Sequence, residues 1–239
     1  MAITATAWWA PKSGNTATEY EDAFAVEPGA QRFAIADGAS ETSFAREWAA
    51  MLVERFVHEP ANAAELAAWL APMQTAWVGA HQGKADAAWY AEEKARAGAF
   101  SSLLGVAIDA NHWRALAVGD SCLFVVRAGK LLRAFPLQRA AEFNNSPVLL
   151  SSVARSNPQK LWSDVRTDEG ELQVADQLLL MTDALAQWFL AESELGRRPW
   201  AALARAATPE GFAAFVDCLR GGGALRNDDV TLVRLEMAA

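Results

Sequence analysis

Hydrophobic and polar residues alternate along two early segments of the chain and then change to a helical spacing. Residues 23–26 and 32–36 flank a Pro-Gly turn, which predicts a β-hairpin. Apolar residues then recur every three or four positions over 44–56 and 66–77, a period that predicts two amphipathic helices. A weaker pattern of the same kind predicts a third helix over 84–97.

The rest of the chain shows strand patterns followed by helical ones. We expect strands at 100–108, 113–118, 123–127, 131–135, 177–182 and 230–236. We expect helices over 184–192, from Pro199, and from Thr208 with Pro209 in its first turn. Residues 136–170 have the composition of a loop, with one short strand at 148–150. Runs of strands that alternate with runs of helices predict an α+β fold, and no linker divides residues 1–239 into two domains.

Composition narrows the class of protein. Hydrophobic residues make up 52% of the chain and charged residues 21%, which is enough apolar material for a large core. The net charge of -8 argues against a nucleic-acid-binding protein. No apolar run is long enough to span a membrane, and no signal peptide is evident, so a cytoplasmic protein is expected.

Aspartates stand where predicted strands begin or end. Asp22 precedes the first strand of the hairpin, and Asp37 follows the second. Asp183 follows one later strand, and Asp228 precedes the last strand. If each pair of strands is antiparallel, both pairs of acids meet at a sheet edge, and Asp120 ends a further strand. Clustered carboxylates repel one another unless hard divalent cations bind them, although a single Asp at a strand end is also a common turn residue.

The order of these acids resembles that of the type-2C metal-dependent serine/threonine protein phosphatases, as in a divergent bacterial member. The resemblance extends from Glu21 to Val233 in the family's order. It is carried by residues 21–24 (EDAF), 33–39 (FAIADGA), 98–102 (GAFSS), 117–121 (AVGDS), 178–185 (LLLMTDAL) and 228–233 (DDVTLV).

The resemblance implies a four-layer αββα sandwich, in which helices flank two antiparallel sheets. It also implies two metal ions, Mn²⁺ or Mg²⁺, at one edge of the sandwich, which activate a water for attack on a phosphate ester. Asp37 would bridge both metals, and the carbonyl of Gly38 would bind one of them. The other roles carried over are metal binding by Asp183, Asp228 and Asp22, catalysis by Asp37 and Asp22, and a further metal-site or supporting role for Glu21, Asp120 and Asp229.

One position departs from the family in a way that bears on the substrate. The family has a phosphate-binding arginine five residues before the acid matched by Asp22, and here that position is Ala17. A methyl group cannot replace a bidentate guanidinium. Lys12, Arg32 and Arg46 are candidate substitutes, and each is also readily explained as a surface charge.

Three functions therefore stay open. The first is hydrolysis of phosphoserine and phosphothreonine in a phosphoprotein, such as the product of a Ser/Thr kinase. The second is a catalytically weak pseudophosphatase that acts as a binding or regulatory module. The third is hydrolysis of another small phosphoester. Oxygen ligands suit Mg²⁺ and Mn²⁺ alike.

Overall fold

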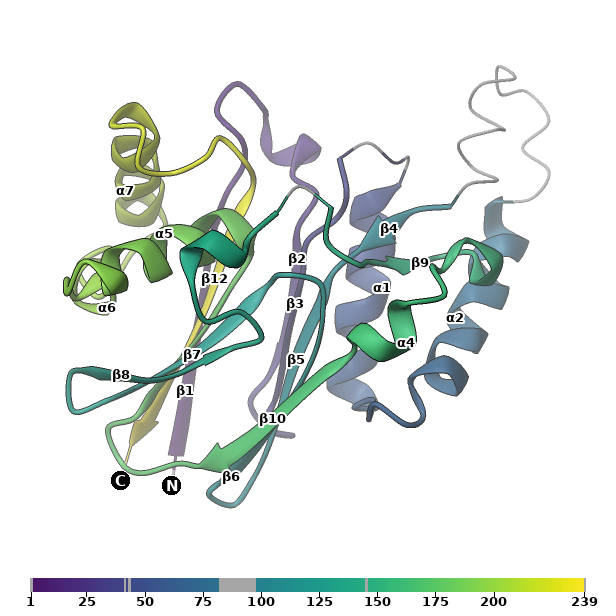
Figure 1. The fold of residues 1–239 in the computed structure, drawn as a ribbon, viewed down its shortest axis with the longest axis horizontal. Helices are drawn as coiled ribbons and strands as arrows, with labels where there is room; N and C mark the ends of the chain where they lie inside the picture. Colours follow the sequence, from purple (N-terminus) through teal and green to yellow (C-terminus); the bar gives the residue numbers. More distant parts are fainter. Residues whose placement is uncertain (1, 41, 43, 82–97, 145, 239) are drawn as a thin grey trace.

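Two five-stranded antiparallel sheets lie face to face, and helices cover both outer faces (Figure 1). The computed structural model describes residues 2–40, 42, 44–81, 98–144 and 146–238. The strands are β1 (Ala2–Ala10), β2 (Ala23–Glu27), β3 (Arg32–Ala36), β4 (Phe100–Ser101), β5 (Leu103–Asp109), β6 (His112–Val118), β7 (Cys122–Arg127), β8 (Lys130–Phe135), β9 (Leu150–Ser151), β10 (Arg166–Glu171), β11 (Gln177–Met181) and β12 (Val230–Ala238). The α-helices are α1 (Ala45–His58), α2 (Leu66–His81), α4 (Leu161–Asp164), α5 (Asp183–Glu194), α6 (Pro199–Leu203) and α7 (Pro209–Gly221). Short 3-10 turns cover Ala17–Glu19, Ala140–Glu142 and Ala154–Ser156.

The strand order brings distant parts of the chain together. One sheet has the order β1-β12-β11-β7-β8, and the other has the order β10-β6-β5-β3-β2. The predicted hairpin is β2–β3, in which Ala23 pairs with Ala36. The later pair is β11–β12, in which Met181 pairs with Leu232. Both pairs are antiparallel, as the placement of the aspartates requires.

Alternation along the strands sorts the core into three layers. In β3, Phe33 and Ile35 pack between the sheets, whereas Ala34 and Ala36 face α1 and α2. In β7, Leu123 packs between the sheets and Phe124 faces the other helices. Since successive side chains of a strand point to opposite faces, each sheet is buried on both sides.

The helices are held by their apolar faces. Helix α1 lies on the outer face of the β2–β3–β5 sheet, with Trp48, Leu52 and Phe56 fully buried beneath it. Helices α5, α6 and α7 cover the opposite side, as Figure 1 shows. Thr208 caps α7, because its hydroxyl oxygen accepts the Gly211 N–H at 3.0 Å. The predicted four-layer arrangement is thereby confirmed.

Two strands were not predicted. Strand β1 alternates small Ala and Thr residues, so its hydrophobic contrast is weak, and it is an edge strand that pairs with β12 alone. Strand β10, which begins inside the segment expected to be loop, has the polar sequence RTDEGE and is held by its ladder with β6. Helix α4 lies in the same segment. The helix expected over 84–97 falls outside the described residues. No described helix has the length and apolar character needed to cross a membrane.

Candidate metal centre

The hairpin β2–β3 brings Asp22 and Asp37 to the same sheet edge. Asp22 precedes Ala23, Asp37 follows Ala36, and these two alanines are cross-strand partners. Gly38 permits the close approach of the two loops, because a Cβ at this position would lie 2.6 Å from the backbone oxygen of Glu21. Glycine is thus required here by the close contact between these two loops.

Three carboxylates from three loops converge at this edge. One oxygen from each of Asp37, Asp120 and Asp183 lies within 4.8 Å of the others. Asp183 is the first residue of α5, and Asp120 lies in the turn between β6 and β7. That turn needs Gly119, whose φ of +96° belongs to the left-handed region that favours glycine. The sequence placed these acids at strand ends, and the sheet register brings them together.

Serines fix the backbone of Asp37. The Asp37 N–H donates to Ser102 Oγ at 2.9 Å, and the Asp37 carbonyl accepts the Ser102 N–H at 2.9 Å. The same carbonyl accepts the Ser101 hydroxyl at 2.8 Å. Ser102 also hydrogen-bonds Ser121. The Asp37 loop is therefore tied to the start of β5 and to the turn that carries Asp120.

Burial and mutual repulsion disfavour the charged forms of these acids. Burial, followed by the charges of Asp22 and Asp183, raises the pKa of Asp37 well above its ordinary value. Burial and the charge of Asp183 raise the pKa of Asp120 to about 7. Burial also raises the pKa of Asp183, although Arg226 opposes the shift. Such a group of acids is stabilised when a cation neutralises it.

Asp22 is the most enclosed of the predicted site acids, with 2% of its surface exposed. Its Oδ2 accepts the Thr231 hydroxyl at 2.6 Å, and Thr231 in turn hydrogen-bonds the Tyr20 hydroxyl. Its Oδ1 is buried without a hydrogen-bond partner. Burial raises the pKa of Asp22 well above its ordinary value, although the bond from Thr231 opposes this.

Asp228 lies beside two cations rather than within the cluster of three. Its Oδ1 is 3.2 Å from Lys12 Nζ, and its Oδ2 is 3.1 Å from an Arg226 nitrogen. The same Arg226 nitrogen contacts Asp183, so this guanidinium bridges two of the predicted ligands. Lys12 Nζ is also 3.8 Å from Glu21.

Asp229 has a different environment from Asp228. Its Oδ1 accepts the Lys12 N–H at 2.8 Å, and its Oδ2 accepts the Glu21 N–H at 2.7 Å. Both oxygens are thus engaged by backbone, and the residue ties two loops to the start of β12. A positioning role suits Asp229 better than metal binding.

The donor set fits hard divalent cations. Asp37, Asp120 and Asp183 offer only oxygen, which is what Mg²⁺ and Mn²⁺ prefer. Oδ1 of Asp22, which is buried without a hydrogen-bond partner, is a further oxygen that a cation or a water could satisfy.

Several residues of the site had no role assigned from the sequence, although Ser102 and Thr231 lie within the matched stretches 98–102 and 228–233. Thr231, Tyr20 and Ser102 orient the acids, and Arg226 neutralises two of them. Arg226 stands two residues before Asp228, and this proximity was the only signal available.

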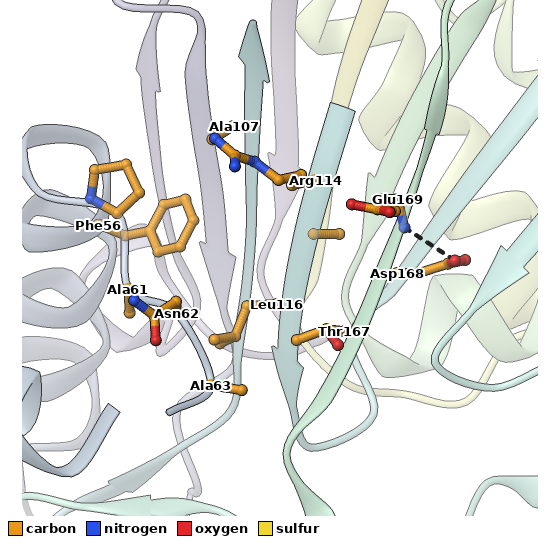
Figure 2. A pocket seen from close by; sticks show the side chains of 12 residues that line it. Phe56, Ala61, Asn62, Ala63, Ala107, Arg114, Leu116, Thr167, Asp168 and Glu169 are labelled. Atoms are coloured by element: carbon orange, nitrogen blue, oxygen red, sulfur yellow. Dashed lines mark hydrogen bonds between the residues drawn. The ribbon is translucent and has the colours of Figure 1, made fainter. Parts of the chain in front are cut away.

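A separate pocket of about 530 Å³ lies away from the acids, on the outer face of the β5–β6–β10 sheet (Figure 2). Phe56 and Asn62 approach it from the helical side, and Arg114, Asp168 and Glu169 from the strands. None of the predicted ligands lines it.

Comparisons with known proteins agree with this geometry. The family model described as protein phosphatase 2C matches residues 16–220. No curated protein matches the chain significantly.

Many solved structures have a similar fold, and three of them illustrate the likeness. PppA, described as a key regulatory component of T6SS in Pseudomonas aeruginosa, matches at 18% identity and a TM-score of 0.62, covering 99% of this chain and 98% of that one. The catalytic domain of the phosphatase PstP, solved with two manganese ions, matches at 19% identity and a TM-score of 0.63, with 99% of each chain covered. RsbX with magnesium matches at 16% identity and a TM-score of 0.54, covering 99% of this chain and 96% of that one. The metals in the latter two are the ones expected from the sequence.

Proposed function

Because the chain belongs to the protein phosphatase 2C family, we propose that it hydrolyses phosphoserine and phosphothreonine in proteins with the help of two divalent ions. The observation that carries the proposal is the convergence of the Asp37, Asp120 and Asp183 carboxylates. The phosphoprotein product of a Ser/Thr kinase is the expected substrate.

The site residues would have two kinds of role, direct binding of the metal ions and contact through bound water. Asp37, the Gly38 carbonyl, Asp183 and Asp228 would hold Mn²⁺ or Mg²⁺, and Asp22 and Glu21 would act through water. Asp120 would serve an additional ion or support the same cluster. When bound, such ions supply a water that ionises near neutral pH and offset the charge of the phosphoryl oxygens.

The protein contributes a fixed arrangement of groups around the reaction. The serines that bond the Asp37 backbone hold its carboxylate at the edge. Thr231 leaves one Asp22 oxygen available, because it bonds only the other. Groups fixed in this way need no reorganisation when charge develops.

Hydrolysis of p-nitrophenyl phosphate and of a phosphothreonine peptide in Mn²⁺ tests the proposal. We expect Asp37→Asn to lower the rate on the order of a hundredfold or more, and a chelator to abolish it. Asp109→Asn is the matched control, because Asp109 is exposed at the opposite end of β5. Activity that persists in Asp37→Asn, or that ignores the chelator, would rule the proposal out.

A pseudophosphatase is the second candidate. It is favoured by the methyl group at Ala17 and by the Arg226 bridge between Asp183 and Asp228, which already neutralises two predicted ligands. It predicts Mn²⁺ binding by calorimetry without turnover of any phosphoester. A substrate panel of phosphopeptides and small phosphoesters separates the protein phosphatase from a hydrolase of other esters.

A further inference from the structure

A phosphoryl dianion that enters this edge meets mainly carboxylates, so it needs a cation from the protein as well as any bound ion. Ala17 cannot supply one. Of the three candidate substitutes, Arg32 donates to the carbonyls of Val57 and His58 at the end of α1. Arg46 donates to the carbonyls of Ala17 and Thr18 at 3.1 and 3.4 Å. Both guanidinium groups thus bind backbone carbonyls rather than site acids.

The side chain of Lys12 is placed differently. Its Nζ contacts Asp228, Glu21 and the Ser40 hydroxyl. The side chain is 22% exposed, so it is partly accessible to solvent. Lys12 thus stands where the acids of the N-terminal and C-terminal loops meet.

The backbone of Lys12 is anchored at this position. Asp229 accepts its N–H at 2.8 Å, and its carbonyl accepts the Asn15 N–H at 3.0 Å. The next residue, Ser13, donates its N–H to Asn227 Oδ1 at 2.7 Å. Three hydrogen bonds therefore fix the backbone of the loop that carries Lys12.

Two arginines also lie at this edge. Arg220 donates to the Asp228 carbonyl at 2.6 Å and its side chain is only 8% exposed, and one nitrogen of Arg226 bridges Asp183 and Asp228. Lys12 also contacts two carboxylates, but at the longer distances of 3.2 Å from Asp228 and 3.8 Å from Glu21, and its ammonium group has three donor hydrogens. An ammonium group is also a point charge that imposes little direction on its partner.

We propose that Lys12 is the substrate-binding cation of this site and contacts the phosphoryl oxygens in place of a guanidinium at position 17. The proposal rests on the proposed function for its substrate, a phosphate monoester. Because an ammonium group lacks the planar fork of arginine, the site should accept phosphoesters of varied shape.

Binding of inorganic phosphate to the Mn²⁺-loaded protein, measured by calorimetry, tests the role without turnover. We expect Lys12→Gln to weaken phosphate binding about tenfold or more, and Lys12→Arg to retain most of it. Mn²⁺ affinity should not fall in Lys12→Gln, because the change removes a positive charge beside Asp228. Arg46→Gln is the matched control and should leave phosphate affinity unchanged.

Three results would overturn the proposal. The first is an unchanged phosphate affinity in Lys12→Gln. The second is a loss of phosphate affinity in Arg46→Gln that equals or exceeds the loss in Lys12→Gln. The third is a parallel loss of Mn²⁺ affinity and thermal stability in Lys12→Gln, which would indicate a structural role. The two proposals fail separately. If the wild-type protein binds phosphate through Lys12 but hydrolyses no ester, only the proposed function is contradicted. If the enzyme is active and Lys12→Gln changes neither its KM nor its inhibition by phosphate, only the role of Lys12 is contradicted.

Discussion

We expect the substitution Asp120→Asn to stabilise the metal-free protein, and to do so more at alkaline than at acid pH. Burial and the charge of Asp183 raise the pKa of Asp120 from 3.8 to about 7 in the folded protein. Between these two values the folded state keeps a proton that the unfolded chain has lost. The free energy of unfolding therefore falls as the pH rises through this window.

The size of the effect follows from the shift. The reference is acid pH, where Asp120 is protonated in both the folded and the unfolded protein. At about 1.4 kcal/mol per pH unit, the raised pKa of Asp120 lowers the free energy of unfolding from that reference by about 1.5 kcal/mol at pH 5 and by about 4 kcal/mol at pH 8. Asparagine does not titrate, and its effect on packing is the same at both pH values. The difference between variant and wild type should grow by about 2.5 kcal/mol, or roughly 5–10 °C in Tm for a chain of this size.

Thermal unfolding followed by circular dichroism, in the presence of a chelator, measures this difference at both pH values. The exposed Asp109→Asn is the control and should show no such growth between pH 5 and 8. If the advantage of Asp120→Asn is the same at both pH values, the repulsion inferred for this cluster is refuted.

Three further substitutions test the packing of the fold, the first of them beside the site. Gly38→Ala places a Cβ 2.6 Å from the Glu21 backbone oxygen. Calorimetry should therefore show weaker Mn²⁺ binding, and chemical denaturation should show a free energy of unfolding lower by about 1–3 kcal/mol. Unchanged binding would mean that the loops adjust freely. Asp176→Ala removes a fully buried carboxylate that binds Arg127 and the Gln173 N–H. Urea unfolding should show a free energy of unfolding lower by about 3–5 kcal/mol, and a decrease below about 1 kcal/mol would contradict the prediction. Phe124→Ala empties a fully buried position stacked on Phe189 and should cost about 3–5 kcal/mol in the same assay, whereas a near-neutral result would show that the helical layer collapses onto β7.

Much of the fold could be predicted where burial differs sharply along the chain. Strand β11 and helix α1 have strong apolar patterns, and the structure places them where the sequence predicts. Strands β1 and β10 could not be found in this way. Most side chains of β10 are exposed, most of those of β1 are exposed or only partly buried, and backbone pairing with β12 and β6 holds the two strands in place. Hydrogen-bond ladders at a sheet edge leave little trace in side-chain chemistry.

The site was partly predictable for a related reason. Acids at strand ends can be located from the sequence, but which of them meet depends on strand register and on loop contacts. Asp120 was expected at an additional metal site or in a supporting role, and one of its oxygens lies within 4.8 Å of oxygens of Asp37 and Asp183. Asp228 instead faces Lys12 and Arg226. Charge pairing between distant loops decides this arrangement, and no local pattern encodes it.

The position of β12 has a consequence for the order of assembly during synthesis. Among the five strands of its sheet, β12 is the last to leave the ribosome, yet it lies between β1 and β11. The start of β12 carries Thr231, which holds Asp22, and the residues just before it include Asp229, which anchors the Lys12 and Glu21 loops. A nascent chain can form the β2–β3 hairpin early, but the sheet closes and the acids reach their final positions only when the last strand inserts.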